Sequence, residues 1–234
     1  MTLPGRLITA GAVGVAFLLL GLQAAVQAQG PPVTGDAQRG AVIAAQGVAD
    51  NVPACAPCHA LNGSADVSGA FPRLAGQSAY YLARQITEYA SGVRASAIME
   101  PIAKALSADD RAAVAAYFAT ADGPFLVSKK ADPALVERGR QLARVGDEAK
   151  ALPSCNNCHG PGGTGEFPAI PYLAGQYADY TALQLKLWQG GSRKGSPGGM
   201  AEIAKRLNDN DIAAVAAYYQ QLRAPVEVSA QPTK

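Results

Sequence analysis

The chain has 234 residues, of which 20 are Lys or Arg and 18 are Asp or Glu, so its formal net charge is +2. This near-neutral balance, with no basic run, argues against nucleic acid as a partner. The chain has only four cysteines, two histidines and three methionines, so any site for a soft metal has few residues to draw on.

Residues 1–28 have the features of a secretory signal peptide. Arg6 precedes an uncharged apolar run from Leu7 to Val26, and the segment ends in the small-residue pattern VQA at 26–28. We therefore expect export and cleavage after Ala28. The alternative is an uncleaved membrane anchor, because the run approaches the roughly 20 residues that span a bilayer. No comparable stretch follows, so we expect the mature chain to be soluble or peripherally associated with a membrane.

After the signal peptide, the secondary structure is expected to be helical throughout. Ala, Leu, Gln and Arg dominate the periodic stretches, and no window alternates apolar and polar residues. Ser107 is a predicted N-cap, with acids in the first turn of a helix over 108–120. The stretch 121–131 is linker-like. Asp132 and Pro133 are expected to open the next helix, and Asn208 to cap a helix over 209–222.

An internal repeat divides the chain into two units. PRLAGQSAYYLARQI at 72–86 lines up with PYLAGQYADYTALQL at 171–185, and MEPIAKALSADDRAAVAAYF at 99–118 lines up with MAEIAKRLNDNDIAAVAAYY at 200–219. Gly40 and Gly139 recur as well, and we expect each to let the first helix of its unit cross the last helix closely, near Tyr117 and Tyr218. The repeat predicts the following boundaries: a first domain at 29–124, a linker at 125–131, a second domain at 132–224 and a mobile tail at 225–234.

Every cysteine and histidine falls in two C-x-x-C-H motifs, CAPCH at 55–59 and CNNCH at 155–159. A thioredoxin-like redox pair follows a strand, and no strand is expected here. Structural zinc needs four ligands, whereas each motif supplies three in a separate domain. Haem attachment uses every residue, since two thiols add to the porphyrin vinyl groups and the adjacent histidine ligates iron. The sequence thus predicts two covalently bound haem c groups, attached through Cys55, Cys58, Cys155 and Cys158, with His59 and His159 on the irons.

Met99 and Met200, the only methionines apart from Met1, are candidate sixth ligands. A lone methionine in an apolar stretch is more often core filler, but these two lie at matching places just ahead of IAKAL and IAKRL. A His/Met pair holds iron at a relatively high potential and leaves no open position for a substrate. We therefore expect electron transfer and no enzymatic activity. A diheme peroxidase would need an open or displaceable ligand, of which the sequence shows no sign.

Other recurring residues have two interpretations each. The carbonyls of Pro72 and Pro171 could accept the free Nδ1–H of the histidines and fix the rings, or each Pro-x-Leu could be a simple turn with a buried leucine. Tyr81, Tyr180, Arg94 and Arg193 could contact haem edges or propionates, or could serve helix packing and solvation.

With its paired C-x-x-C-H motifs, twin P-x-LAGQ segments and twin M-x-x-IA-x-x-L segments ending in VAAYF and VAAYY, the chain resembles the diheme cytochromes of the cytochrome c4 family. The resemblance covers essentially the whole mature chain. It implies an all-α fold of two tandem class I cytochrome c domains, each wrapped around one covalently attached haem, with His/Met haems near a pseudo-twofold interface. The second unit departs from the first in PAI at 168–170 and in GGSRKGSPGG at 190–199.

The family also implies a function, with one alternative. A periplasmic carrier of this kind passes single electrons between respiratory donors and a terminal oxidase or similar acceptor, so its partners are redox proteins, some of them membrane-bound. The alternative is a diheme electron-accepting subunit of a dehydrogenase complex, such as a sulfide-oxidising flavocytochrome, whose sequences look similar.

Overall fold

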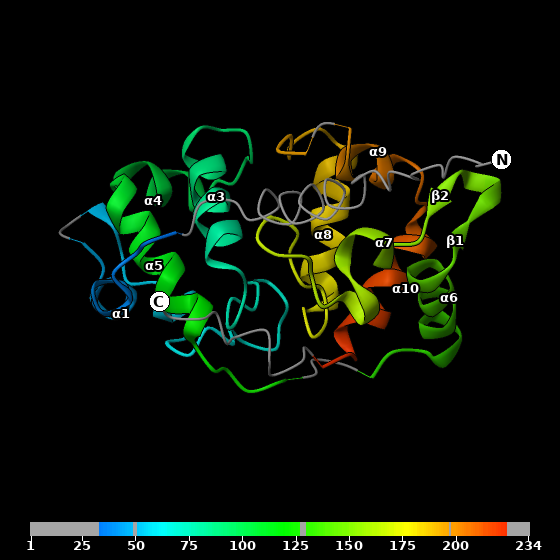
Figure 1. The fold of residues 1–234 in the computed structure, drawn as a ribbon, viewed down its shortest axis with the longest axis horizontal. Coiled ribbons are helices and arrows are strands. Elements are labelled where there is room, and N and C mark those ends of the chain that lie inside the picture. Colours follow the sequence, from blue (N-terminus) through cyan, green and yellow to red (C-terminus); the bar gives the residue numbers. More distant parts are fainter. Residues whose placement is uncertain (1–32, 49–50, 127–129, 197, 224–234) are drawn as a thin grey trace, which may run out of the picture. The chain divides into compact units, whose positions relative to one another are not determined.

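The computed structural model describes residues 33–48, 51–126, 130–196 and 198–223. The predicted signal peptide and the predicted tail lie outside these ranges. Within them, no helix combines the length and the apolar character needed to cross a membrane. Figure 1 shows the elements in chain order, from α1 in blue to α10 in red.

The first half of the described chain is helical. Its elements are α1 (Ala37–Gln46), α2 (Ala56–His59), α3 (Ala79–Ala90), α4 (Met99–Ala105) and α5 (Ala108–Thr120). Helix α1 packs on α5, and α3 packs on α4 and α5. The predicted cap of α5 is confirmed, because the Ser107 side chain accepts a hydrogen bond from the Asp110 N–H.

The second half repeats this order with two insertions. Its elements are α6 (Pro133–Arg144), β1 (Gly146–Asp147), the 3-10 helix η2 (Glu148–Lys150), β2 (Leu152–Pro153), α7 (Asn156–His159), η3 (Pro161–Gly163), α8 (Ala178–Gln189), α9 (Met200–Lys205) and α10 (Asp209–Gln220). The predicted caps are again confirmed: Asp132 caps α6, and Asn208 forms a capping box with Asp211 at α10. Helix α10 ends at Gln220, two residues earlier than expected.

The predicted all-α fold is confirmed, with one small departure from helices alone. Strands β1 and β2 form a two-stranded antiparallel sheet that pairs Gly146 with Pro153 and Asp147 with Leu152. The turn between them passes through Ala151, whose φ of 49° is left-handed. Strands of two residues are too short to show an alternating pattern, so the sequence carries no signal for them.

In each half one glycine fixes the crossing of two helices, as expected. A Cβ on Gly40 would lie 2.1 Å from the carbonyl oxygen of Ala113, and one on Gly139 would lie 2.0 Å from that of Ala214. The first Cβ would also collide with the Cβ of Tyr117, and the second with the Cβ of Tyr218. Only glycine therefore allows α1 to cross α5, and α6 to cross α10, at this distance (Figure 1).

Candidate functional site

Each C-x-x-C-H motif forms a single helical turn, α2 or α7. The N–H of His59 donates to the Cys55 carbonyl at 2.9 Å, and His159 repeats this bond to Cys155 at 2.9 Å. The turn brings both thiols and the imidazole of one motif together, and all four cysteines are free thiols. This compact arrangement is what a porphyrin held by two thioethers and one axial imidazole requires.

The first thiol of each motif is not suited to redox exchange. Burial, with a smaller contribution from Cys58, raises the pKa of Cys55 above its usual value. Burial also raises the pKa of Cys155 to about 11. Both groups therefore stay protonated at neutral pH, whereas a reactive redox pair needs a thiolate.

The histidine rings are oriented by proline carbonyls, as one of the two interpretations predicted. His59 Nδ1 lies 3.4 Å from the Pro72 carbonyl oxygen, and His159 Nδ1 lies 2.9 Å from that of Pro171. A carbonyl can only accept, so each Nδ1 carries the proton and each Nε2 has a free lone pair. Burial lowers the pKa of both histidines, which favours the neutral ring that binds metal.

The two methionines begin equivalent helices. Met99 is the first residue of α4 and Met200 the first of α9. Serine hydroxyls accept from their backbone N–H groups, Ser96 from Met99 at 3.0 Å and Ser196 from Met200 at 3.2 Å. Neither serine was predicted from the sequence, although each lies three or four residues before its methionine.

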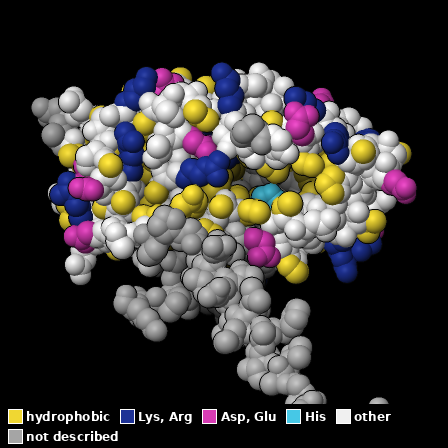
Figure 2. All heavy atoms as spheres, turned by 45° about the horizontal axis from the view of Figure 1, so that its top comes forward, with side chains coloured by type: hydrophobic (Ala, Val, Ile, Leu, Met, Phe, Trp, Pro, Cys, Tyr) yellow, Lys and Arg dark blue, Asp and Glu magenta, His cyan; other side chains and the backbone are white. Residues whose placement is uncertain are grey.

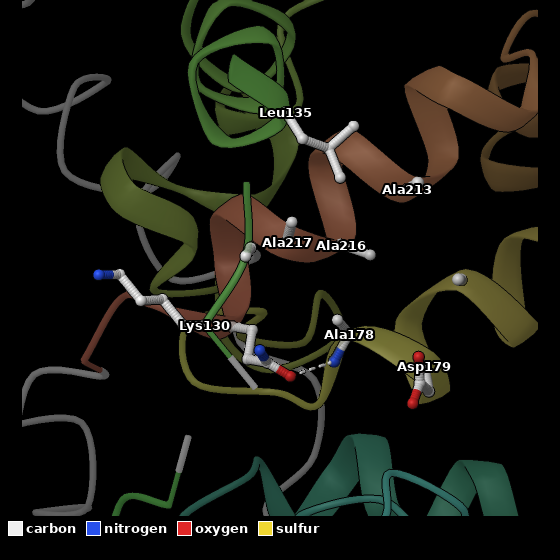
Figure 3. Close-up of a pocket in the computed structure, with 10 residues that line it drawn as sticks. Lys130, Leu135, Ala178, Asp179, Ala213, Ala216 and Ala217 are labelled. Carbon is white, nitrogen blue, oxygen red and sulfur yellow. Dashed lines mark hydrogen bonds between the residues drawn. The ribbon is translucent and has the colours of Figure 1, made fainter. Parts of the chain in front are cut away.

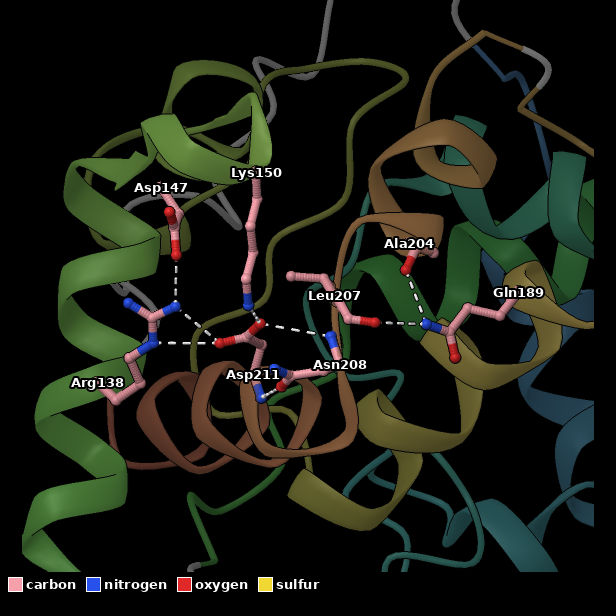
Figure 4. A network of polar contacts seen from close by, with 8 residues as sticks. All are labelled: Arg138, Asp147, Lys150, Gln189, Ala204, Leu207, Asn208 and Asp211. Carbon is pink, nitrogen blue, oxygen red and sulfur yellow. Dashed lines mark hydrogen bonds and ion pairs between the residues drawn. The ribbon is translucent and has the colours of Figure 1, made fainter.

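The far end of α9 is also anchored. Gln189 of α8 donates from Nε2 to the carbonyls of Ala204 and Leu207, both at 2.8 Å (Figure 4). Because these carbonyls lie at and beyond the end of α9, the bonds hold the helix that begins with Met200 against α8.

A charged network supports the segment that leads into the second motif. Arg138 of α6 donates to Asp147 at 2.7 Å and to Asp211 at 2.8 Å, and Lys150 pairs with the same Asp211 (Figure 4). In the first half, Arg39 and Asp110 form the equivalent pair at 2.5 Å. Both aspartates lie in the first turn of a helix with a predicted cap, but their arginine partners were not predicted from the sequence.

Residues from both halves line one cavity. Cys158, His159 and Met200 line it together with Tyr81 and Glu88 from α3 of the first half. The further lining residues are Arg84, Gln85, Ala169, Ile170, Pro171, Trp188, Arg193, Gly195, Ser196, Gly199 and Ile203. The structure thus brings the predicted iron ligands of the second motif together at one site, and the first half forms part of its wall.

Figure 2 shows a histidine set among hydrophobic side chains on one face of the molecule, with Lys or Arg side chains nearby. One buried donor, Nε1 of the cavity-lining Trp188, is without a hydrogen-bond partner among the described residues. Unpaired buried N–H groups are costly, and propionates are acceptors of the kind they need. An apolar cavity lined by an imidazole, a thioether sulfur and a spare donor therefore fits a haem.

A second cavity does not have the lining that a haem requires. It lies between α6, α8 and α10 and is lined mainly by small side chains such as Ala178, Ala216 and Ala217, beside Lys130 (Figure 3). None of its lining residues is a cysteine, histidine or methionine.

The two halves are joined by a buried arginine pair. Arg94 and Arg193, only 3% and 4% exposed, occupy equivalent positions and form an antiparallel bridge. Arg94 Nη2 donates to the Tyr180 hydroxyl at 2.7 Å, and Arg193 Nη2 donates to the Tyr81 hydroxyl at 2.9 Å. Each arginine therefore reaches the tyrosine of the other half, a role that the sequence analysis did not foresee. Their contact with haem stays a prediction.

Two glutamines complete this pair. The amide oxygen of Gln184 accepts from Arg94 at 2.6 Å and from Arg193 at 3.1 Å, and that of Gln85 accepts from them at 2.8 and 2.7 Å. Backbone bonds from Ala95 N–H to the Ser192 carbonyl, and from Lys194 N–H to the Val93 carbonyl, flank the cluster. These contacts obey a pseudo-twofold symmetry: each contact occurs twice, with the two halves in swapped roles.

The pseudo-twofold symmetry of the two halves is broken beside the cavity. Arg84 Nε pairs with the buried Glu88 at 2.8 Å, and its guanidinium also bonds the Gly195 carbonyl. The equivalent positions in α8 are Leu183 and Leu187. The second motif therefore faces a charged pair from the first half, whereas the second half has leucines at the matching positions.

Family models match both halves. The model "Cytochrome c" matches residues 37–122, and "Cytochrome C oxidase, cbb3-type, subunit III" matches residues 141–218. Among curated proteins, the chain is 38% identical to a thiosulfate dehydrogenase electron acceptor from Stutzerimonas stutzeri, over 88% of this chain and 91% of that one. It is 36% identical to a cytochrome c4 from Pseudomonas aeruginosa, over 88% and 96%.

Solved structures give the same result. Reduced recombinant cytochrome c4 from Pseudomonas stutzeri has a TM-score of 0.69 and 33% identity, and covers 81% of this chain and 100% of that one. Thiosulfate dehydrogenase (TsdBA) from Marichromatium purpuratum has a TM-score of 0.72 and 38% identity, but this chain spans only 40% of it. Two cytochrome c domains imply two covalently bound haem c groups. The chain is a diheme electron-carrying cytochrome of the cytochrome c4 family.

Proposed function

We propose that His59 and Met99 are the axial ligands of the first haem, that His159 and Met200 are those of the second, and that the four motif cysteines form the thioether links. The support is geometric. The imidazoles are neutral with Nδ1 held by proline carbonyls, and Cys158, His159 and Met200 line one cavity. The domain boundaries at 29–124 and 132–224 belong to the same proposal.

The chain's own residues then have defined tasks. A bound haem supplies a reversible one-electron couple. The Pro72 and Pro171 carbonyls fix the rings, the serines and Gln189 hold the methionine helices, and buried arginines supply positive charge where the halves meet. With both axial positions filled by the protein, no open coordination site is left for a substrate, which supports a carrier rather than an enzyme.

The observation that carries the proposed function is the shared cavity. Because first-half side chains from α3 line the site of Cys158 and His159, the two redox centres belong to one connected structure. We propose that an exported, periplasmic protein uses this arrangement to pass single electrons from respiratory donors to a terminal oxidase or a similar acceptor. The near-neutral net charge favours docking through local patches over long-range steering.

A second candidate function rests on the similarity to the thiosulfate dehydrogenase electron acceptor. In that case the protein accepts electrons within a dehydrogenase complex. This is the alternative that the sequence left open, a diheme electron-accepting subunit of a dehydrogenase complex, of which a sulfide-oxidising flavocytochrome is another example.

Purification and stopped-flow mixing separate the two candidates. The fully reduced holoprotein is mixed with membranes that contain an active terminal oxidase, and reoxidation is followed in the haem bands. A carrier elutes alone and is reoxidised rapidly and completely. Stable co-elution with a dehydrogenase, combined with slow reoxidation by the membranes, would overturn the carrier function in favour of the acceptor subunit.

A further inference from the structure

Two buried glutamines connect each half to the ligand region of the other. Gln77 and Gln176 follow the two LAG segments and are 5% and 7% exposed. Gln176 accepts from the Arg73 N–H at 2.9 Å and donates to the Arg73 carbonyl at 2.9 Å. Gln77 accepts from the Tyr172 N–H at 3.3 Å and donates to the Tyr172 carbonyl at 3.2 Å. Each side-chain amide thus pairs with both backbone groups of one residue across the interface.

The peptide groups that these glutamines bind also hold the histidines. The carbonyl of Pro72 and the N–H of Arg73 belong to one peptide group, and that carbonyl faces His59 Nδ1 at 3.4 Å. The hydrogen bonds therefore run from the His59 ring through this peptide to Gln176. In the other half they run from His159 through the Pro171–Tyr172 peptide to Gln77, beginning with the 2.9 Å bond to Pro171.

Such a chain of hydrogen bonds polarises its members. An acceptor on the N–H side of a peptide group increases the negative charge on its carbonyl oxygen, and strengthens the hydrogen bond that this oxygen accepts by about 10–30% in condensed phases. A more negative oxygen draws the Nδ1 proton of the histidine more strongly and makes the ring a better donor to iron. Stronger donation favours the oxidised iron and lowers its potential.

We propose that Gln176 positions and strengthens His59 as a ligand, and that Gln77 does the same for His159, so that each half sets part of the potential of the other's haem. This inference rests on the proposed ligation by the two histidines. Both glutamines are positioning residues, since they act through a peptide group and not on the iron.

The test compares Gln176→Leu with Tyr177→Phe in the holoprotein. The leucine removes the acceptor for the Arg73 N–H. The phenylalanine removes another bond across the same interface, from the Tyr177 hydroxyl to the Ser64 carbonyl at 2.6 Å, and leaves the Arg73 peptide intact. Gln176→Glu keeps the shape and the acceptor, and serves if the leucine variant does not fold.

In Gln176→Leu we expect the equilibrium between oxidised and reduced first haem to shift two- to fivefold toward reduction, which equals about 18 to 41 mV at 59 mV per tenfold. The second haem should keep its potential. Gln176→Glu should shift the first haem in the opposite direction. Tyr177→Phe should change neither. In Gln77→Leu the potential of the second haem should shift instead. The control for this variant is Ser78→Ala, which removes the bond from the Ser78 hydroxyl to the Pro168 carbonyl at 2.7 Å.

The second readout is NMR of the reduced, diamagnetic protein. The Nδ1–H resonance of His59 should move upfield in Gln176→Leu and exchange faster with solvent, while that of His159 stays in place. Equal shifts of both haems, a shift of the second haem only, or the same shift in Tyr177→Phe would overturn the inference. If the wild-type His59 ring lacks the large ring-current shift of an axial ligand, the ligation itself fails and not only the role of Gln176.

Discussion

Replacing Arg193 with leucine should release the two domains from each other without unfolding either of them. The guanidinium makes bonds of 2.9 Å to Tyr81 and 2.7 Å to Gln85 across the interface. Hydrogen bonds to charged groups contribute about 1.5–3 kcal/mol each. Part of this sum is offset because leucine has no charge to desolvate. We therefore expect docking to weaken by about 3–4 kcal/mol, a factor between about 10² and 10³.

The assay is hydrogen exchange at Ala95. Its N–H donates to the Ser192 carbonyl across the interface at 2.8 Å, so its exchange requires undocking. In Arg193→Leu this amide should exchange about 10² to 10³ times faster, while amides within α5 keep their protection. Lys194→Gln is the control, because it removes an exposed charge from the same segment and leaves the backbone bonds in place. Unchanged exchange at Ala95, or equal acceleration within α5, would refute the reasoning.

Replacing Cys55 and Cys58 with alanine should remove about half of the covalently bound haem, since each motif holds its own group. Acid–acetone extraction followed by a pyridine haemochrome assay measures the haem that stays on the protein. Loss of all haem would contradict this prediction. Met99→His should keep the first haem six-coordinate and lower its potential by on the order of hundreds of millivolts, within the roughly 0.8 V range that axial ligands span; an optical redox titration that finds an unchanged potential would require another ligand. Burial alone would raise the pKa of Asp211, but bonds from Lys150 and Arg138 hold it below its usual value. Its stabilising contribution is therefore present above pH about 4 and is lost as pH falls through the lowered folded pKa, so Asp211→Asn should flatten the acid limb of a plot of unfolding free energy against pH. Gly139→Ala should destabilise the second domain by about 3 kcal/mol or more, because α6 must move away from the Ala214 carbonyl; urea unfolding measures it, and an effect below about 1 kcal/mol would show that the crossing adjusts freely.

Local chemistry made much of this fold predictable. The caps at Ser107, Asp132 and Asn208 were visible because side-chain capping depends on residues a few positions apart. The close helix crossings at Gly40 and Gly139 were predictable because the repeat placed a glycine in the same context twice.

The contacts between the halves could not be predicted in the same way. Arg94 and Arg193 were singled out by their recurrence, but recurrence does not show whether a side chain faces its own domain or the other one. Gln77 and Gln176 were visible only as part of the LAGQ repeats. Their role depends on which backbone groups the docked surfaces bring together, and docking is a property of the tertiary structure.

The crossed pairing at Arg94 and Arg193 makes the interface self-complementary. A surface that meets its own copy about a twofold axis is isologous, so one domain of this kind could in principle make the same bonds with a second, separate copy. Joining the copies through the predicted linker at 125–131 would remove the dependence on protein concentration, since a short tether holds its partners at an effective concentration on the order of millimolar. Once fused, the copies are free to diverge: Arg84 and Glu88 stand where Leu183 and Leu187 stand in the other. The tether thus turns a symmetric dimer surface into a directional pair, in which the two ends no longer need to behave alike.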